Sequence, residues 1–315
     1  MAGDSATGTA VAARRVFVVL NPAAGTCTAD DVREALGRYF SCEQGACDIH
    51  ETTARDDLSA LVREAAARGC DLVVAAGGDG TVSVVADGVT GTETPLGIIP
   101  LGTANVLARE LGVPVVLDDA CRLLAGPLAT TAIDAMVVGE RSYLTQVGVG
   151  IDALMIRDTG RDQKRRLGRL AYLWTAALHL IGFEPRRFSI AVDGHPVERT
   201  RASQVVVANS ATLGQHPFRW GPDIRPDDGR VDVCVVRARS LIDYINLAWY
   251  VLMGQHRRSP HVRYLYACRS ATIGSDRPLP VQADGEIIGE TPVEVRVAVG
   301  AVRVVTPPPE ARAQQ

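Results

Sequence analysis

The sequence predicts an α/β N-terminal domain built on a parallel sheet, followed by a mainly antiparallel β domain. In the first domain, short apolar runs alternate with segments of helical periodicity, which is typical of a parallel sheet covered on both faces. After about residue 130, short strands with few intervening helices indicate an antiparallel domain. We place the boundary at residue 135, so that the α/β domain spans 15–135 and the β domain spans 136–305, between disordered ends at 1–14 and 306–315.

The first strand is the continuously apolar run VFVVL at 16–20, which stops at Asn21-Pro22. Thr28 or Asp30 is the expected cap of the helix that follows, and Thr81 is the expected cap of the third helix. In chain order the domain has strands at 16–20, 47–53, 71–76 and 95–99 and helices at 29–39, 56–68, 81–89, 103–112 and 118–125.

The second domain is predicted from turn-bounded strands with two helical interruptions. The helix at 241–253 is apolar enough to be core, which we favour over a lipid groove. Neither 170–183 nor 241–254 approaches the roughly 20 apolar residues of a spanning helix. The expected strands are 131–138, 142–148, 187–193, 204–209, 230–236, 270–274, 293–298 and 301–305, and the helices are 164–181 and 241–253.

Composition narrows the classes of function. The formal net charge of −3 offers no basic field for nucleic acid. The seven cysteines contain no CxxC pair, which favours a reduced, cytoplasmic protein without a zinc site. Lys164 is the single lysine among 33 basic residues, so neither a P-loop nor a protein-kinase site can be built. No GxGxxG sequence is present, which disfavours a Rossmann dinucleotide site.

Small-residue loops follow each strand of the first domain, at Asn21–Gly25, Thr52-Thr53, Gly77–Thr81 and Pro100–Thr103. The carboxyl ends of parallel strands meet at one edge of a sheet, where ligands bind. Backbone N–H groups, hydroxyls and helix N-termini at that edge suit a phosphate-rich anion. Glycines around Asp79 admit a ligand close to a carboxylate.

The motifs NPAAG (21–25), GGDGT (77–81) and IIPLGTANVLARELGVP (98–114) resemble the catalytic domain of diacylglycerol-kinase-type lipid kinases, a family that includes the sphingosine and ceramide kinases. The likeness continues through GVGID (148–152), PDDGRVD (226–232) and DGE (284–286), and so covers residues 16–305. It implies an ATP site formed by Asn21, Pro22, Ala23, Ala24, Gly25, Thr53, Gly77, Gly78, Gly80, Thr81, Val82, Ser83, Val84, Gly102, Thr103 and Asn105.

The resemblance also implies catalytic carboxylates. Sphingosine kinases use the GGDG aspartate as base, here Asp79, whereas bacterial members use the DGE glutamate, here Glu286, beside Asp284. Many bacterial relatives have an aspartate where this chain has Val106, and Asp134 is our candidate for its role in the magnesium network. These acids come from opposite ends of the chain, so they meet only if the active site lies between the domains.

The resemblance further implies a structural magnesium site that uses the side chain of Asp228 and the main chains of Arg225 and Arg230. Asp152 in the GVGID segment is assigned to substrate binding, together with Arg165 and Arg169. These arginines belong to the basic stretch 157–169, which is either a solvated helix face or a contact with anionic lipid headgroups or ATP phosphates.

The sequence therefore predicts a cytoplasmic lipid kinase that uses ATP and Mg²⁺, with diacylglycerol as the leading acceptor. Phosphoryl transfer needs positioning and charge neutralisation, which these loops and acids supply. The alternatives are a sphingoid-base or other lipid-alcohol kinase, an NAD-kinase-like enzyme, and a non-catalytic nucleotide-binding module. The expected partner is a lipid presented at the inner face of a membrane, with peripheral contact only, and a homodimer stays open.

Overall fold

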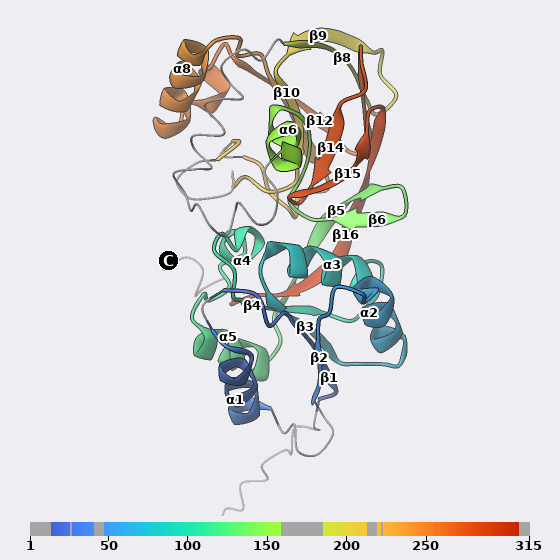
Figure 1. Cartoon of the computed structure of the whole chain (residues 1–315), viewed down its shortest axis with the longest axis vertical. Coiled ribbons are helices and arrows are strands. Elements are labelled where there is room, and N and C mark those ends of the chain that lie inside the picture. The colour runs from blue at the N-terminus through green and yellow to red at the C-terminus, as the bar shows by residue number, and fades with distance from the viewer. Residues whose placement is uncertain are drawn as a thin grey trace, which may run out of the picture.

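The structure is a computed structural model that describes residues 14–25, 27–40, 47–158, 185–212, 219–221 and 223–308. The expected helix at 164–181, and with it Arg165 and Arg169, lies outside the described residues. Figure 1 shows the α/β domain at the bottom and the β domain at the top, with the two long strands β5 and β16 running between them.

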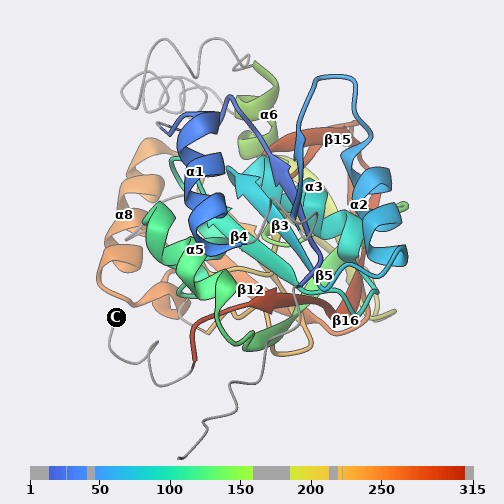
Figure 2. The same cartoon turned by 90° about the horizontal axis from the view of Figure 1, so that it is seen from below.

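The α/β domain is a parallel sheet in the order β2-β1-β3-β4. Figure 2 shows α1 and α5 on one side of these strands and α2 and α3 on the other. Its elements are β1 (Val16–Leu20), α1 (Ala29–Tyr39), β2 (Cys47–Glu51), α2 (Leu58–Ala67), β3 (Leu72–Gly77), α3 (Asp79–Val89), β4 (Leu96–Pro100), α4 (Val106–Glu110) and α5 (Leu117–Ala125).

The alternation of side chains along β1 explains why its sequence is apolar throughout. Val18 and its alternate neighbours pack with α1 and α5, whereas Phe17 and Val19 pack with α2 and α3. A strand that is buried on both faces needs apolar residues at every position. The two-sided parallel sheet predicted from the sequence is confirmed.

The β domain is a sandwich of two antiparallel layers that enclose a second core. One layer continues the first sheet, because β16 pairs in parallel with β4 and antiparallel with β5 and β13. The other layer has the order β12-β11-β10-β7-β14-β15. The elements are β5 (Thr130–Val138), β6 (Arg141–Tyr143), β7 (Gln146–Gly150), α6 (Ile151–Asp158), β8 (Arg186–Val192), β9 (Glu198–Ala202), β10 (Gln204–Ala208), β11 (Val231–Val236), α8 (Leu241–Leu252), η2 (His256–Arg258), β12 (Val262–Ala267), β13 (Ser270–Ser275), β14 (Pro280–Ala283), β15 (Glu286–Glu290) and β16 (Val293–Val305).

Several predicted boundaries are wrong for identifiable reasons. The strand expected at 142–148 is two strands, β6 and β7, because the chain turns at Leu144 and Thr145 to bind a carboxylate. The strands expected at 293–298 and 301–305 are one strand, β16, which bulges near Gly300. The helix expected at 103–112 is the five-residue α4, since the side chain of Asn105 closes a turn before it.

Other differences concern caps and surface elements. Thr28 caps α1 as expected, but α3 begins at Asp79 with Gly78 as its N-cap, so the expected cap Thr81 lies inside the helix. The helix at 241–253 was expected in the core; none of the residues of α8 is buried. The strands β9, β12, β14 and β15 and the helix α6 were not predicted.

Candidate active site

The loops that follow β1, β3 and β4 touch one another. Asn21 Nδ2 donates to Thr81 Oγ1 at 3.2 Å, which joins the NPAAG loop to the GGDGT turn. A Cβ on Gly102 would lie 2.7 Å from the Cα of Gly78, so only glycine allows the PLGT loop to approach the GGDGT turn this closely. Gly25 has φ of +71°, and a Cβ there would clash with the carbonyl of Leu101. These contacts give one continuous rim of backbone at the carboxyl edge of the sheet.

Thr53, after β2, is fixed by Asp56 rather than left open. Its N–H and its hydroxyl both donate to the Asp56 carboxylate, at 2.7 Å and 2.8 Å. These hydrogen bonds, with a further one from His50, lower the pKa of Asp56. Because both donors of Thr53 are used, its hydroxyl can offer a nucleotide only an acceptor.

Asp79 occupies the centre of the rim, in the first turn of α3. Its carboxylate accepts hydrogen bonds from the backbone N–H groups of Asn105, at 3.0 Å, and Val106, at 2.6 Å. Asn105 adopts the left-handed conformation with φ of 48°, and its side-chain amide closes on both polar atoms of Gly102. Val106 thus meets Asp79 through its backbone N–H, which any residue other than proline provides at that position.

Burial raises the pKa of Asp79, and the negative charge of Asp284 raises it further. The two backbone N–H groups act in the opposite direction and only partly offset the burial. A carboxylate with a raised pKa is a stronger base near neutral pH than an ordinary aspartate. Asp79 therefore combines a fixed position with enhanced basicity.

Asp284, in the turn between β14 and β15, reaches α3 from the second domain. Ser83 Oγ donates to its carboxylate at 2.8 Å, across 201 positions of sequence. The backbone N–H groups of Leu144, Thr145 and Gln146 donate to the same carboxylate at 2.9 to 3.0 Å. With the Thr145 hydroxyl, five donors converge on Asp284, so this side chain holds the two domains together at the candidate site.

Glu286 lies two residues further, at the first position of β15, and is half-buried. Burial raises the pKa of the Tyr143 phenol, and the negative charges of Asp284, Asp87 and Glu286 contribute to that shift. Glu286 therefore lies within electrostatic range of the same interdomain region. The structure brings the GGDGT and DGE motifs, and with them Asp79 and Asp284, together at the boundary between the domains, with Glu286 beside them.

Asp152, in α6, supports the DGE turn from behind. Gln282 Nε2 donates to Asp152 Oδ2 at 3.0 Å, and Gln282 Oε1 accepts from the N–H of Gly285 at 3.0 Å. Asp152 Oδ1 is buried and has no hydrogen-bond partner among the described residues. Burial raises the pKa of Asp152 to about 6.

Among the described residues, the carboxylate of Asp134, in β5, makes no hydrogen bond to the loops that hold Asp79, Asp284 or Asp152. One carboxylate oxygen accepts from the N–H of Gly229 at 2.7 Å and the other from the N–H of Gly300 at 2.8 Å. It therefore fixes the DGRVD loop against the bulge of β16. A role for Asp134 with a magnesium ion at the rim stays a prediction.

The expected structural magnesium loop forms ion pairs of its own. Asp228 accepts from Arg230 Nε at 3.1 Å, and Arg225 pairs with Asp227 at 2.9 Å. The side chain of Asp228 is thus engaged with its neighbour, and the predicted ligand set of Asp228 with two main-chain groups stays a prediction.

The chemistry of the rim fits Mg²⁺ that arrives bound to phosphates. Across the part of the chain that is described, no three His, Cys, Asp or Glu side chains gather into a preformed metal cage. Magnesium on a nucleotide needs only one or two carboxylates, because phosphate oxygens and water complete its shell. Asp79 retains lone pairs beyond its two hydrogen bonds, and the mutual repulsion of Asp79 and Asp284 favours a cation between them.

Thr145, Gln146, Gln282 and Asn209 are site residues that sequence reasoning missed. Thr145 and Gln146 hold Asp284, Gln282 joins Asp152 to the DGE turn, and Asn209 donates to the carbonyls of Asp134 and Leu144. Each makes a hydrogen bond in which at least one partner is a backbone group, or which joins two motifs distant in sequence. The one available signal was the position of Gln282, two residues before Asp284.

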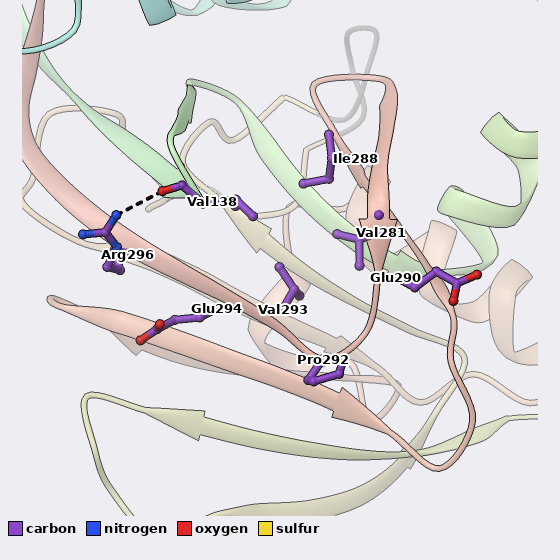
Figure 3. A pocket seen from close by; sticks show the side chains of 10 residues that line it. Val138, Val281, Ile288, Glu290, Pro292, Val293, Glu294 and Arg296 are labelled. Carbon is purple, nitrogen blue, oxygen red and sulfur yellow. Dashed lines mark hydrogen bonds between the residues drawn. The ribbon is translucent and has the colours of Figure 1, made fainter.

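A separate cavity of about 430 Å³ opens at the edge of the sandwich (Figure 3). Val138, Val281, Ile288 and Val293 form apolar walls, and Arg296 at the rim donates to the carbonyl of Gly139 at 3.2 Å. Residues at the end of β15 remote from Glu286 line this cavity, so it is distinct from the rim of loops described above.

Among the described helices, none is long and apolar enough to cross a membrane.

Two protein families match the chain. Residues 15–138 match the diacylglycerol kinase catalytic domain, and residues 145–306 match the YegS C-terminal NAD kinase beta sandwich-like domain. Diacylglycerol kinase from Bacillus subtilis is 28% identical over 305 residues, which cover 93% of this chain and 97% of the relative. A protein of Pseudomonas putida named probable lipid kinase YegS-like is 36% identical over 148 residues, covering 46% of this chain and 49% of the relative.

Solved structures agree with the sequence relatives. The crystal structure of a diacylglycerol kinase from Bacillus anthracis has a TM-score of 0.77 at 25% identity and covers 95% of this chain and 98% of that one. An NAD kinase from Archaeoglobus fulgidus, solved with ATP, has a TM-score of 0.53 at 14% identity over 95% of this chain and 96% of that one, a likeness of fold.

Proposed function

The chain belongs to the family of lipid kinases that join a diacylglycerol kinase catalytic domain to a YegS C-terminal domain, and from that premise we propose that it phosphorylates diacylglycerol. In the proposed reaction a lipid hydroxyl oxygen bonds to the γ-phosphorus of ATP, the bond to the β-phosphate oxygen breaks, and the hydroxyl proton passes to a carboxylate. The products are phosphatidic acid and ADP. The choice of diacylglycerol as acceptor is supported by relatives that match 93% of this chain and carry the name diacylglycerol kinase.

The observation that carries the mechanism is the position of Asp79. It is fixed by the N-terminus of α4, at the contact of the GGDGT and PLGT loops, opposite the DGE turn that Ser83 holds in place. Backbone N–H groups of the rim bind the phosphates of ATP and orient the γ-phosphoryl group. A lipid hydroxyl that enters between the domains would meet the γ-phosphate beside Asp79.

Asp79 and Glu286 are the two candidate proton acceptors. We assign the role to Asp79, because burial and the charge of Asp284 raise its pKa and so strengthen it as a base. Asp284 is assigned a positioning role, because five donors already use its lone pairs. Mg²⁺ would be held mainly by the ATP phosphates and water in the neighbourhood of Asp79, where the ion would neutralise the charge that develops on transfer.

This assignment places the enzyme in the cytoplasm, where ATP and Mg²⁺ are available, with its lipid acceptor in the adjoining membrane leaflet. The acceptors to be compared are diacylglycerol, a sphingoid base, a long-chain isoprenoid alcohol and NAD, each supplied with labelled ATP and Mg²⁺ in mixed micelles or buffer. We expect labelled phosphatidic acid as the main product. A main product from another lipid would replace the acceptor, phosphorylation of NAD alone would overturn the lipid assignment, and tight ATP binding without any product would indicate a non-catalytic module.

A further inference from the structure

The outer face of α8 carries apolar side chains that the fold leaves in contact with water. Figure 1 shows this helix on the outside of the β domain. Only Tyr244 and Leu247 pack against the core beneath it. Ile242, Ile245 and Trp249 are 76%, 62% and 61% exposed. We call the following set the α8 face: Leu241, Ile242, Ile245, Trp249, Leu252 and Met253.

These residues recur at helical spacing, so they form a stripe rather than scattered exposures. Contiguous exposed apolar patches are rare on monomeric proteins because water contact with them is unfavourable, and they mark sites where a partner binds. Trp249 is a notable member, since tryptophan is favoured where an apolar region meets water at a membrane interface.

Arginines flank α8 at both of its ends. Arg239 precedes the helix, and Arg257 and Arg258 follow it in η2; all three are exposed. Arg239 and Arg258 have no ion-pair partner within the described part of the chain, and Arg257 pairs only with the exposed Asp223. The single acid of α8, Asp243, is used by the capping box, where it accepts from the N–H groups of Arg239 and Ser240. Both ends of the stripe are therefore flanked by positive charge.

The charge pattern distinguishes between two occupants of this surface. In a two-fold dimer through the α8 face, Arg239 of one copy would meet Arg239 or Arg257 and Arg258 of the other, which places like charges together. An anionic bilayer instead offers hydrocarbon to the apolar stripe and negative headgroups to the arginines. We propose that the α8 face docks the protein on the surface of an anionic lipid bilayer.

The packing beneath α8 leads directly to the candidate active site. Trp220 belongs to the cluster under α8, and its indole Nε1 donates to Gln146 Oε1 at 3.1 Å. The N–H of Gln146 donates in turn to Asp284. On the same side, Arg219 pairs with Glu110 of α4 at 3.2 Å. The α8 face is thus connected through the packing beneath it to residues that hold Asp284, and the significance of this connection for a membrane-bound substrate rests on the proposed lipid kinase function.

Vesicle co-sedimentation without ATP tests the docking surface. The full-length protein is mixed with phosphatidylcholine vesicles that either contain or lack phosphatidylglycerol. We expect binding to the anionic vesicles, weakening as salt rises, and a loss of at least about tenfold in the double variant Ile245→Glu/Trp249→Glu. Arg239→Glu/Arg258→Glu should remove the preference for anionic lipid. Val197→Glu is the matched control, since Val197 is 57% exposed on the β8–β9 turn and lies outside the stripe.

The variants must retain the wild-type melting temperature, which their exposed positions favour. Unchanged vesicle binding in Ile245→Glu/Trp249→Glu would overturn the proposal. So would sedimentation velocity that shows a wild-type dimer dissociated by this variant while its vesicle binding persists, since the face would then join two copies. Kinase activity on a dispersed short-chain diacylglycerol separates the two proposals: a docking variant should keep that activity and lose it only on vesicles, whereas a wild type that is inactive on every lipid would remove the kinase assignment alone.

Discussion

Two carboxylates meet at the domain boundary in opposite circumstances. Asp79 accepts two backbone hydrogen bonds from the start of a five-residue helix and has a raised pKa. Asp284 accepts five hydrogen bonds. Three of them come from the consecutive backbone N–H groups of Leu144, Thr145 and Gln146, at the turn that separates β6 from β7. A carboxylate saturated by donors fixes structure, whereas a desolvated carboxylate with few donors exchanges protons and attracts cations.

Loss of each acid should have a different consequence, and the largest effect is expected at Asp79. Asp79→Asn removes the proposed base and a negative charge, so kcat should fall by about 10³-fold or more. Steady-state kinetics with the preferred lipid measure this loss. Near-normal turnover would transfer the role of base to Glu286, for which Glu286→Gln is the matched variant.

Although Asp79→Asn should lower kcat, it should not lower the stability of the fold. Because the folded-state pKa of Asp79 is raised, its contribution to stability is complete below the unfolded pKa and is lost as pH rises through the folded value. At pH 8, where the side chain is ionised in the unfolded chain, the raised pKa of Asp79 therefore weakens the fold. The melting temperature of Asp79→Asn at pH 8 should equal or exceed that of the wild type, and a large drop would show that Asp79 is a structural residue instead.

Asp284→Ala, unlike Asp79→Asn, should lower the stability of the fold together with turnover. It removes the acceptor for the N–H groups of Leu144, Thr145 and Gln146, which lie at the junction of the domains. Water can replace part of these bonds because Asp284 is half-buried, so we expect a loss of about 2–4 kcal/mol in the free energy of unfolding. Urea denaturation measures it. A loss of turnover with full stability would contradict the positioning role.

Asp284 also shows what the sequence could reveal about this site. The DGE motif was recognisable, and its meeting with GGDGT required only that the site lie between domains. Its partners could not be predicted, since Leu144, Thr145 and Gln146 contribute backbone N–H groups that no side-chain pattern encodes. The same contacts split the expected strand 142–148, so one tertiary interaction accounts for a missed turn and a missed role.

The fold was more predictable than the site for a physical reason. Strands such as β1, buried on both faces, must be apolar at every position, and this leaves a strong local pattern. The interpretation of α8 as core was wrong because hydrophobicity alone does not tell which surface covers a helix. Its exposed Ile242 and Trp249 resemble core residues in sequence, and only the structure shows that nothing among the described residues covers them.

Asp152 is a third carboxylate, buried like Asp79 but hydrogen-bonded by the side chain of Gln282. Its pKa is raised from 3.8 to about 6, so its ionisation should weaken the fold progressively between about pH 4 and pH 7. Asp152→Asn abolishes this ionisation. Relative to the wild type, the variant should gain about 2 kcal/mol between pH 4 and pH 8, from urea denaturation at both values. A difference independent of pH would show that Asp152 ionises at the same pH in the folded and unfolded states, so that its pKa is not raised by folding.

The smallest effect is expected at Ser83, where the two regions touch. Ser83→Ala deletes one of the five donors to Asp284 and should cost about 1 kcal/mol, because four donors still hold the carboxylate. Ser59→Ala is the matched control, since Ser59 Oγ of α2 donates to Asp87 of α3 at 2.6 Å, a contact of the same kind that does not involve Asp284. Both variants should lose similar stability, but only Ser83→Ala should lower kcat, by a few fold, because Ser83 joins α3 to the turn that carries Glu286. Equal kcat in the two variants would mean that the Ser83–Asp284 contact fastens the domains without positioning the reacting groups, and would confine the site to Asp79 and its own loops.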